Sequence, residues 1–349
     1  MYTASVALPA LYGTGSPKGN NAEMKTDGWE LSLSWRDSFK LGGKPFDYSI
    51  KAMVWDSKSV ITKYVNDTGS LGTVKGFIEN GGSPSSYYVG MTVGEIWGYT
   101  VAGLFRDQAD IDSSAIHDFV QASDKVTRPG QVKIADLDGN GFIDPGNFAV
   151  DDHGDLRIIG NQSPRYRYGV NLSARWNGIG LSVFLQGVGA RDWYPGSDAG
   201  MFWGKYGRPF FALIPSIHNY TDDMYSAERN NWDTAYWPRM TTYQSNGTKN
   251  WTRLLEIPNT RYIQSAAYLR VKNIQLDYSF PKHICSAIRL QGLKIYVNAE
   301  NLFTFTPLHK YAPNFDPEGL SYDSDFASAA DGYTYPILKS VTVGVNITF

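Results

Sequence analysis

The sequence lacks most of the features that mark disulfide-rich, nucleic-acid-binding and helical membrane proteins. Its 349 residues include one cysteine, Cys285, which excludes an intrachain disulfide framework and a cysteine-rich zinc site. With 32 basic residues against 34 acidic ones, there is no positive field that could hold nucleic acid. No apolar run approaches the roughly 18 residues that a transmembrane helix needs.

Catalytic motifs are also missing, so we do not expect an enzyme. The five histidines form no HExxH pattern and no pair at i, i+4. Neither the GxSxG motif nor the phosphate-binding GxxxxGK(S/T) motif occurs. Carboxylates in the polar segments still leave a glycosidase pair open, because composition alone does not exclude one.

Hydrophobic alternation with a period of two is the strongest pattern in the chain. In 28–36 the apolar residues Trp29, Leu31, Leu33 and Trp35 alternate with polar ones, and 341–349 alternates in the same way. Such alternation predicts strands with one apolar and one wet face. Seven strands are clear, and an eighth at 1–8 is weaker. The seven span residues 28–36, 46–62, 165–177, 178–190, 266–280, 289–302 and 338–349.

The connections between these strands alternate in length. Short ones fall at 37–44, 177–178 and 281–287, and long ones at 63–164, 191–265 and 303–337. Strands of about 9–11 residues can cross a bilayer, and outer-membrane barrels join them by short periplasmic turns and long extracellular loops. A soluble sandwich also alternates, but it rarely carries three such long connections. We therefore predict an all-β, antiparallel transmembrane β-barrel segment of about eight strands with long extracellular loops.

Several segments, in order along nearly the whole chain, resemble the C-terminal part of the SusC/RagA family of TonB-dependent outer-membrane transporters of Bacteroidetes. The segments are 23–31 (EMKTDGWEL), 133–144 (KIADLDGNGFID), 159–187 (IGNQSPRYRYGVNLSARWNGIGLSVFLQG), 268–281 (YLRVKNIQLDYSFP), 295–306 (IYVNAENLFTFT), 315–318 (FDPE) and the final Phe349. One departure is Asp277, where the family more often has glycine before the aromatic residue.

The resemblance implies an importer of oligosaccharides or peptides in the outer membrane of a Gram-negative, Bacteroidetes-like cell. It implies a SusD-like surface lipoprotein as partner, and the TonB complex as a partner of an N-terminal part that this sequence does not contain. The plug domain is also absent, and about eight strands stand against about 22 in a plugged transporter. Residues 1–10 (MYTASVALPA) do not form a signal peptide. We therefore expect one part of a longer transporter, unable to drive energised transport alone.

Two alternatives remain open at this stage. One is a secreted, calcium-stabilised, carbohydrate-binding β module, and the other is a stand-alone eight-stranded outer-membrane protein. The substrate, the origin of the truncation, the ability of the chain to fold alone and its oligomeric state are not determined by the sequence.

An aspartate-rich segment predicts a calcium loop. Asp136, Asp138, Asn140 and Asp144 supply oxygens at positions 1, 3, 5 and 9, and Phe142 offers its carbonyl at position 7. Gly141 stands at position 6, where the loop turns sharply. The glutamate expected at position 12 is Asn147, for which Asp151, Asp152 or Asp155 could substitute. The alternative is an Asx-rich turn without metal.

The long connection 191–265 holds 15 aromatic residues in 75, which include Trp193, Trp203, Trp232, Trp237 and Trp251. Self-packing of the loop, a partner interface and ligand contact are all compatible with this composition.

Phe349, the last residue, is a candidate assembly signal. An aromatic end to an amphipathic strand resembles the signal that the outer-membrane assembly machinery reads, and chance is the alternative.

Overall fold

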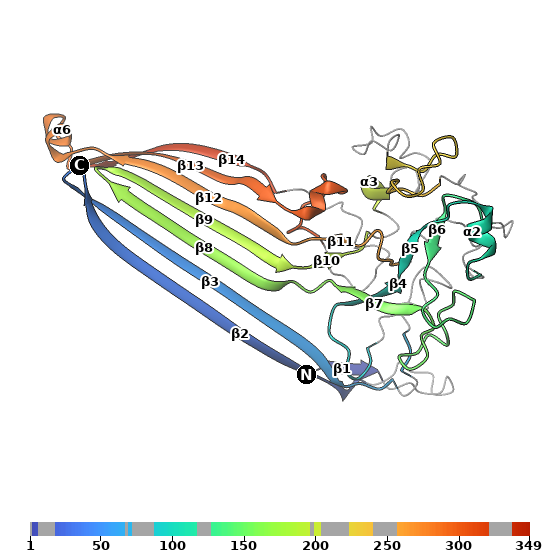
Figure 1. Cartoon of the computed structure of the whole chain (residues 1–349). Coiled ribbons are helices and arrows are strands. Elements are labelled where there is room, and N and C mark those ends of the chain that lie inside the picture. The colour runs from blue at the N-terminus through green and yellow to red at the C-terminus, as the bar shows by residue number, and fades with distance from the viewer. Residues whose placement is uncertain are drawn as a thin grey trace.

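Eight strands form one antiparallel sheet in the order β1-β2-β3-β8-β9-β12-β13-β14 (Figure 1). The computed structural model describes residues 2–5, 18–66, 69–71, 87–116, 127–195, 199–203, 223–239, 257–320 and 337–349. The strands are β1 (Tyr2–Ser5), β2 (Lys18–Leu41), β3 (Lys44–Lys63), β8 (Arg165–Trp176), β9 (Ile179–Ala190), β12 (Tyr268–Ser279), β13 (Gly292–Phe305) and β14 (Ser340–Thr348). Each strand pairs with its neighbours along the chain, so the predicted all-β antiparallel class is confirmed. Among the described residues β1 and β14 do not pair with each other, and the sheet stays open.

The ladder register sorts the side chains by polarity. Leu31 pairs with Val54, and Ile50 pairs with Leu172, so apolar residues share one face. On this face Leu33 is 62% exposed and Val343 is 73% exposed. These side chains therefore do not meet a second sheet, as they would in a sandwich.

The opposite face is mostly polar. One cross-strand row runs from Ser34 through Lys51, Asn171 and Phe184 to Asn273. Phe184 is the single apolar member of this row. We refer to this face as the lumen face, because it is the side that a closed barrel would turn inward.

Short connections join the strands at one end of the sheet. Gly42 and Gly43 have φ of 59° and 77°, and Asn177 and Gly178 have φ of 49° and 86°, as two-residue type I′ turns require. The predicted turn at 37–44 was too long, because β2 continues to Leu41 before the two glycines turn the chain. The third connection contains a short helix, α6 (Lys282–Ala287), in which Cys285 is buried. No helix in the described ranges is long and apolar enough to cross a membrane.

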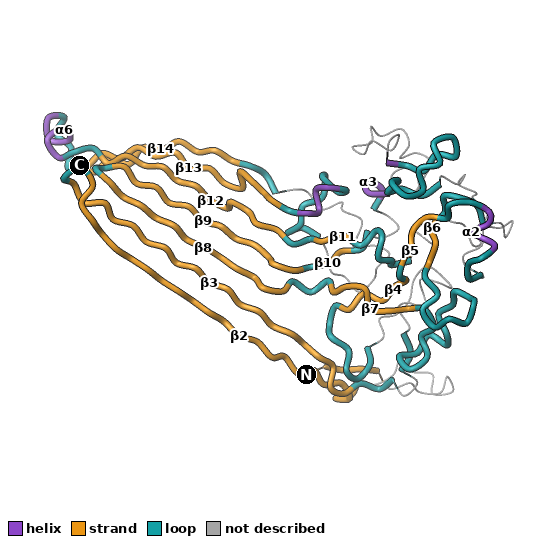
Figure 2. The backbone as a smooth tube through the Cα atoms, viewed as in Figure 1, coloured by secondary structure: helices purple, strands orange, loops and turns teal. Residues whose placement is uncertain are grey.

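The long connections fold at the other end of the sheet into a region that we call the loop cap (Figure 2). The first contains β4 (Glu95–Tyr99), β5 (Val101–Leu104), α2 (Gln108–Asp112), β6 (Val132–Ile134) and β7 (Leu156–Asn161). The second contains β10 (Asp192–Trp193), α3 (Gly200–Trp203) and β11 (Gln264–Ser265), and the third contains the 3₁₀ helix η4 (Pro307–Lys310). The hydrophobic core of the chain lies here, where Tyr99, Trp237 and Leu308 from the three connections are fully buried.

Candidate functional site

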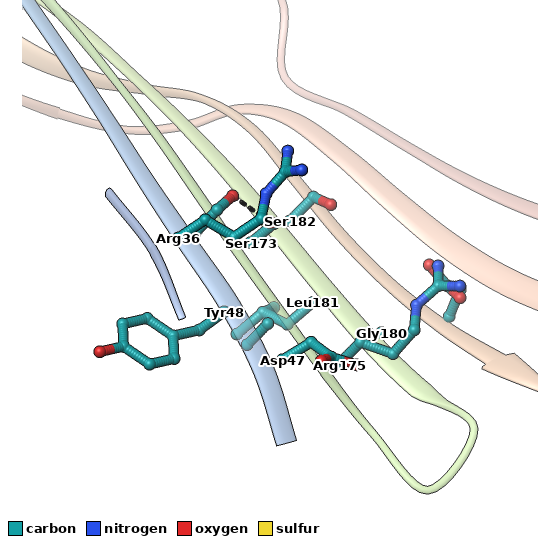
Figure 3. A pocket seen from close by; sticks show the side chains of 11 residues that line it. Arg36, Asp47, Tyr48, Ser173, Arg175, Gly180, Leu181 and Ser182 are labelled. Carbon is teal, nitrogen blue, oxygen red and sulfur yellow. Dashed lines mark hydrogen bonds between the residues drawn. The ribbon is translucent and has the colours of Figure 1, made fainter. Parts of the chain in front are cut away.

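The lumen face carries a polar hollow of about 450 Å³ toward the short-turn end, which we call the inner hollow. Its charged groups are Arg36, Asp47, Arg175 and Asp277, which come from β2, β3, β8 and β12. Figure 3 shows Arg36 and Arg175 on the same side of the sheet, with Tyr48 extending from the other side. Its remaining lining residues are Tyr48, Ser49, Ser173, Ala174, Gly180, Leu181 and Ser182. Two guanidinium groups and two carboxylates balance the charge.

Asp277 occupies space that a glycine leaves free. A Cβ atom on Gly180 would lie 2.8 Å from both carboxylate oxygens of Asp277, so a larger residue at 180 would displace this carboxylate. The side chain is 5% exposed, and Lys294 Nζ lies 3.2 Å from its Oδ1. Oδ2 has no hydrogen-bond partner among the described residues. Asp277 therefore places a buried carboxylate, paired with Lys294, on the lumen face.

A second, smaller hollow of about 200 Å³ lies at the long-loop end of the lumen face, and we call it the outer hollow. Strand residues and the bases of the long connections line it together. The lining residues are Trp55, Pro164, Arg167, Gln186, Gly187, Val188, Arg191, Tyr268 and Glu318. Charged, amide and aromatic groups converge here, which is the composition of a solute-binding site.

An ion-pair network, which we call the Arg270 network, ties the FDPE segment to the wall beside this hollow. Arg270 is 2% exposed and lies 2.5 Å from Asp316 Oδ1 and 2.6 Å from Glu318 Oε2. Lys272 lies 2.8 Å from the same oxygen of Glu318. Burial opposes ionisation of Asp316, but hydrogen bonds from Arg270 and from the backbone N–H of Glu318 outweigh it and lower its pKa. The network therefore fixes 315–318 against β12.

Arg191, which directly follows β9, also binds the FDPE segment. Its guanidinium donates to the carbonyl oxygens of Pro317 and Leu320, each at 2.6 Å. Burial, opposed in part by Tyr268, lowers the pKa of Arg191 to about 10, and the positive charge of Arg167 contributes a smaller lowering. Arg167 and Arg191 both line the outer hollow.

The predicted calcium loop folds as a network of Asx turns on the loop cap. Asp136 accepts the backbone N–H groups of Gly139 at 2.6 Å and Gly141 at 2.9 Å. The side-chain amide of Asn140 donates to Asp138 and Asp144 at 3.1 Å each. Phe142 lies in the same loop, where its N–H donates to Asn140 Oδ1 at 2.7 Å.

Asp155 is the acidic residue that joins this loop from outside it. Oxygens of Asp136, Asp138 and Asp155 lie within 4.8 Å of one another. Burial raises the pKa of Asp155, and the charges of Asp138 and Asp136 add to the increase. Three carboxylates at this spacing repel one another unless a proton or a cation intervenes. The oxygen donors fit a hard cation such as Ca²⁺.

The predicted aromatic residues lie mostly inside the loop cap. Trp193, Trp203 and Trp237 are buried, and the ring of Trp237 stacks on Tyr262 with centroids 5.5 Å apart. Trp232 is partly buried against the same core, and Trp251 lies outside the described residues. Three of the five tryptophans are therefore engaged by the chain itself and do not offer a free ring face.

Phe349 directly follows β14 and is 83% exposed. Its side chain is therefore accessible at the short-turn end of the sheet.

Comparison with known proteins finds TonB-dependent receptors among sequence relatives and a peptide transporter among solved structures of the same fold. No family model matches the chain. TonB-dependent receptor P3 of Formosa agariphila is 24% identical over 350 residues, which cover 98% of the chain and 30% of the receptor. TonB-dependent receptor P26 of the same organism is 22% identical, over 99% of the chain and 31% of the receptor.

Solved structures agree with these relatives. The RagAB peptide transporter matches with a TM-score of 0.63 at 16% identity, over 99% of the chain and 31% of the transporter chain. The predicted resemblance to SusC/RagA-like TonB-dependent receptors is confirmed. The chain spans about a third of the length of the relatives it matches.

Sequence reasoning missed both hollows. Each combines residues from at least three strands that lie far apart in sequence, so no local motif marks them. A usable signal was present, because Arg167, Arg175 and Asp277 are charged residues at predicted lumen-facing positions. The FDPE segment was noticed only through the resemblance, and its clamp to β12 emerges from the structure.

Proposed function

We propose that the chain forms part of the wall and the outer loop cap of a TonB-dependent outer-membrane importer for an oligosaccharide or peptide nutrient. The observation that carries this proposal is a single sheet with one polar face and one apolar face that none of the described residues covers. In water, exposed apolar side chains over a whole sheet would promote aggregation, whereas a bilayer accommodates them. The likeness to TonB-dependent receptors over almost the entire chain supports the same assignment.

The proposed location is the outer membrane of a Gram-negative, Bacteroidetes-like cell. Strands of 12 residues, such as β8 and β9, are long enough to cross a bilayer when tilted. The loop cap would then face the outside, and the short turns the periplasm. Neither alternative is favoured. The exposed apolar face does not suit a secreted module, and an open sheet does not suit a stand-alone eight-stranded barrel.

Partners and substrate follow from the resemblance. We propose a SusD-like surface lipoprotein on the loop cap, TonB engagement through a part of the receptor outside this chain, and membrane insertion by the outer-membrane assembly machinery. One structural relative is a peptide transporter, which supports peptides as one substrate class. The proposed role is transport without covalent chemistry. For Ca²⁺ the proposed ligands are the oxygens of segment 136–144 and Asp155, with a structural role in the loop cap.

Cell fractionation and uptake measurements test the proposal. The protein should remain with outer membranes after carbonate washing and dissolve only in detergent. Deleting its gene in the source bacterium should abolish uptake of one class of labelled oligopeptide or oligosaccharide, and deleting tonB should have the same effect. Recovery of the protein in the soluble fraction would contradict membrane insertion. Uptake that is unchanged in both deletion strains would contradict import.

A further inference from the structure

The outer hollow is formed by one cross-strand row and the residues around it. Trp55 on β3 pairs with Arg167 on β8, Arg167 pairs with Val188 on β9, and Val188 pairs with Tyr268 on β12. Gln186 stands two residues along β9 on the same face. Four strands therefore present their side chains to one small space on the lumen face, beneath the loop cap.

Charge in this space is positive. Arg167 is partly buried, and no carboxylate of the described residues lies within ion-pair distance of it. Glu318, the one acidic residue in the lining, is already held by Arg270 and Lys272. The lowered pKa of Arg191 is consistent with a second positive charge close to Arg167.

The inner hollow differs in this respect, although it lies on the same face and shares strand β8. Its lining has two arginines and two carboxylates, Arg36 and Arg175 with Asp47 and Asp277, and Asp277 is also paired with Lys294 outside the lining. The lining of the outer hollow has two arginines and Glu318 alone, so only this lining carries an excess of positive groups.

We propose that the outer hollow binds a carboxylate of the imported solute, with Arg167 as its charge partner and Trp55 and Gln186 as flanking contacts. Guanidinium groups pair with carboxylates through two parallel N–H···O bonds, and indole and amide groups suit the organic part beside the carboxylate. A space of about 200 Å³ accommodates a group the size of one amino-acid or sugar residue. This inference rests on the proposed import function and narrows its substrate to acidic solutes.

Two sources of such a carboxylate are a peptide and a uronic-acid glycan, and one experiment separates them. Four probes are titrated calorimetrically into the detergent-purified full-length protein. They are a tripeptide with a free C-terminal carboxylate, its C-terminal amide, trigalacturonic acid and its methyl ester. The carboxylate form of one pair should bind at least about tenfold more tightly than its neutral form, because a charge-assisted hydrogen bond contributes one to two decades of affinity.

Substitutions test whether the preference for the carboxylate probe arises from the outer hollow. Arg167→Gln should weaken binding of the carboxylate probe about 10- to 100-fold and leave the neutral probe unchanged, and Arg167→Lys should recover part of the loss. Arg175→Gln is the matched control, because it removes the same charge from the same strand in the inner hollow. Outer-membrane levels of each variant confirm that it folds.

Several results would overturn the inference. They are equal affinity for charged and neutral probes, no binding of either carboxylate probe, an unchanged affinity in Arg167→Gln, or an equal loss in Arg175→Gln. If any of them occurs while uptake still depends on the gene and on tonB, the import function stands and the carboxylate site is wrong. Selective carboxylate binding without such uptake would instead reject the import function.

Discussion

An arginine on the apolar face of β14 should destabilise the protein strongly, whereas the same residue on the neighbouring lumen-facing position should not. Val343 is the fourth of the nine residues of β14 and is next to the central Gly344. At a rise of about 3.3 Å per residue and a tilt of about 45°, Val343 lies roughly 2–3 Å from the midplane of the strand. Arginine at that depth on a lipid-facing position costs about 2–4 kcal/mol.

The Val343→Arg variant should therefore lose a factor of about 30 to about 900 in its folding equilibrium constant. Thr342→Arg is the control, because Thr342 pairs with Asn298 on the polar face. Urea unfolding of the protein in lipid vesicles, followed by tryptophan fluorescence, measures the difference, and heat-modifiable migration of outer-membrane extracts checks it in cells. An equal loss in both variants, or a larger one in Thr342→Arg, would refute the assignment of the two faces.

Four further predictions concern the sheet and the loop cap. Arg270→Gln should destabilise the packing of the FDPE segment by about 3–5 kcal/mol, because it leaves the largely buried carboxylate of Asp316 without its ion-pair partner, and limited proteolysis should cut near 315–318. Because the pKa of Asp316 is lowered in the folded protein, its ionised carboxylate stabilises the fold at pH values above its ordinary pKa of about 3.9. This stabilisation is lost as the pH falls through the lower pKa of the folded state, and proteolysis rates across that pH range measure the loss. Gly344→Ala should cost about 1–3 kcal/mol, since its Cβ would lie 2.2 Å from the ring of Tyr296, and Tyr296→Ala should relieve that clash, as urea unfolding of the double variant tests. Millimolar Ca²⁺ should slow proteolysis of the loop cap, and Asp136→Asn should remove the effect; equal rates with and without Ca²⁺ would reject the metal site.

The strands of the sheet could be predicted from sequence because their information is local. Alternation through Leu31 and Leu33, or through Val341 and Val343, assigns each side chain to a face without any knowledge of neighbouring strands. The prediction ended β2 five residues early because Asp37 interrupts the apolar alternation there, and it began the strand ten residues late, since β2 starts at Lys18. The structure shows that the ladder nevertheless continues through Asp37, which pairs with Tyr48.

The candidate site was less predictable because its groups are assembled by strand register and loop packing. Trp55 and Arg167 are more than 100 positions apart, and only the β3–β8 ladder places them opposite each other. Asp155 accepts the backbone N–H of Leu137, 18 residues earlier, through a turn that no spacing rule anticipates. The small strands β4 to β7 were missed within the first long connection because each is too short to show a period.

The shared core of the loop cap restricts how the outer surface can be changed. Tyr99, Trp237 and Leu308 come from three separate connections and belong to one cluster of buried hydrophobic side chains. Exchanging a single connection for that of a relative would leave unfilled volume or steric overlap in the remaining two. Chimeric receptors intended to acquire a new specificity should therefore receive all three connections as one cassette.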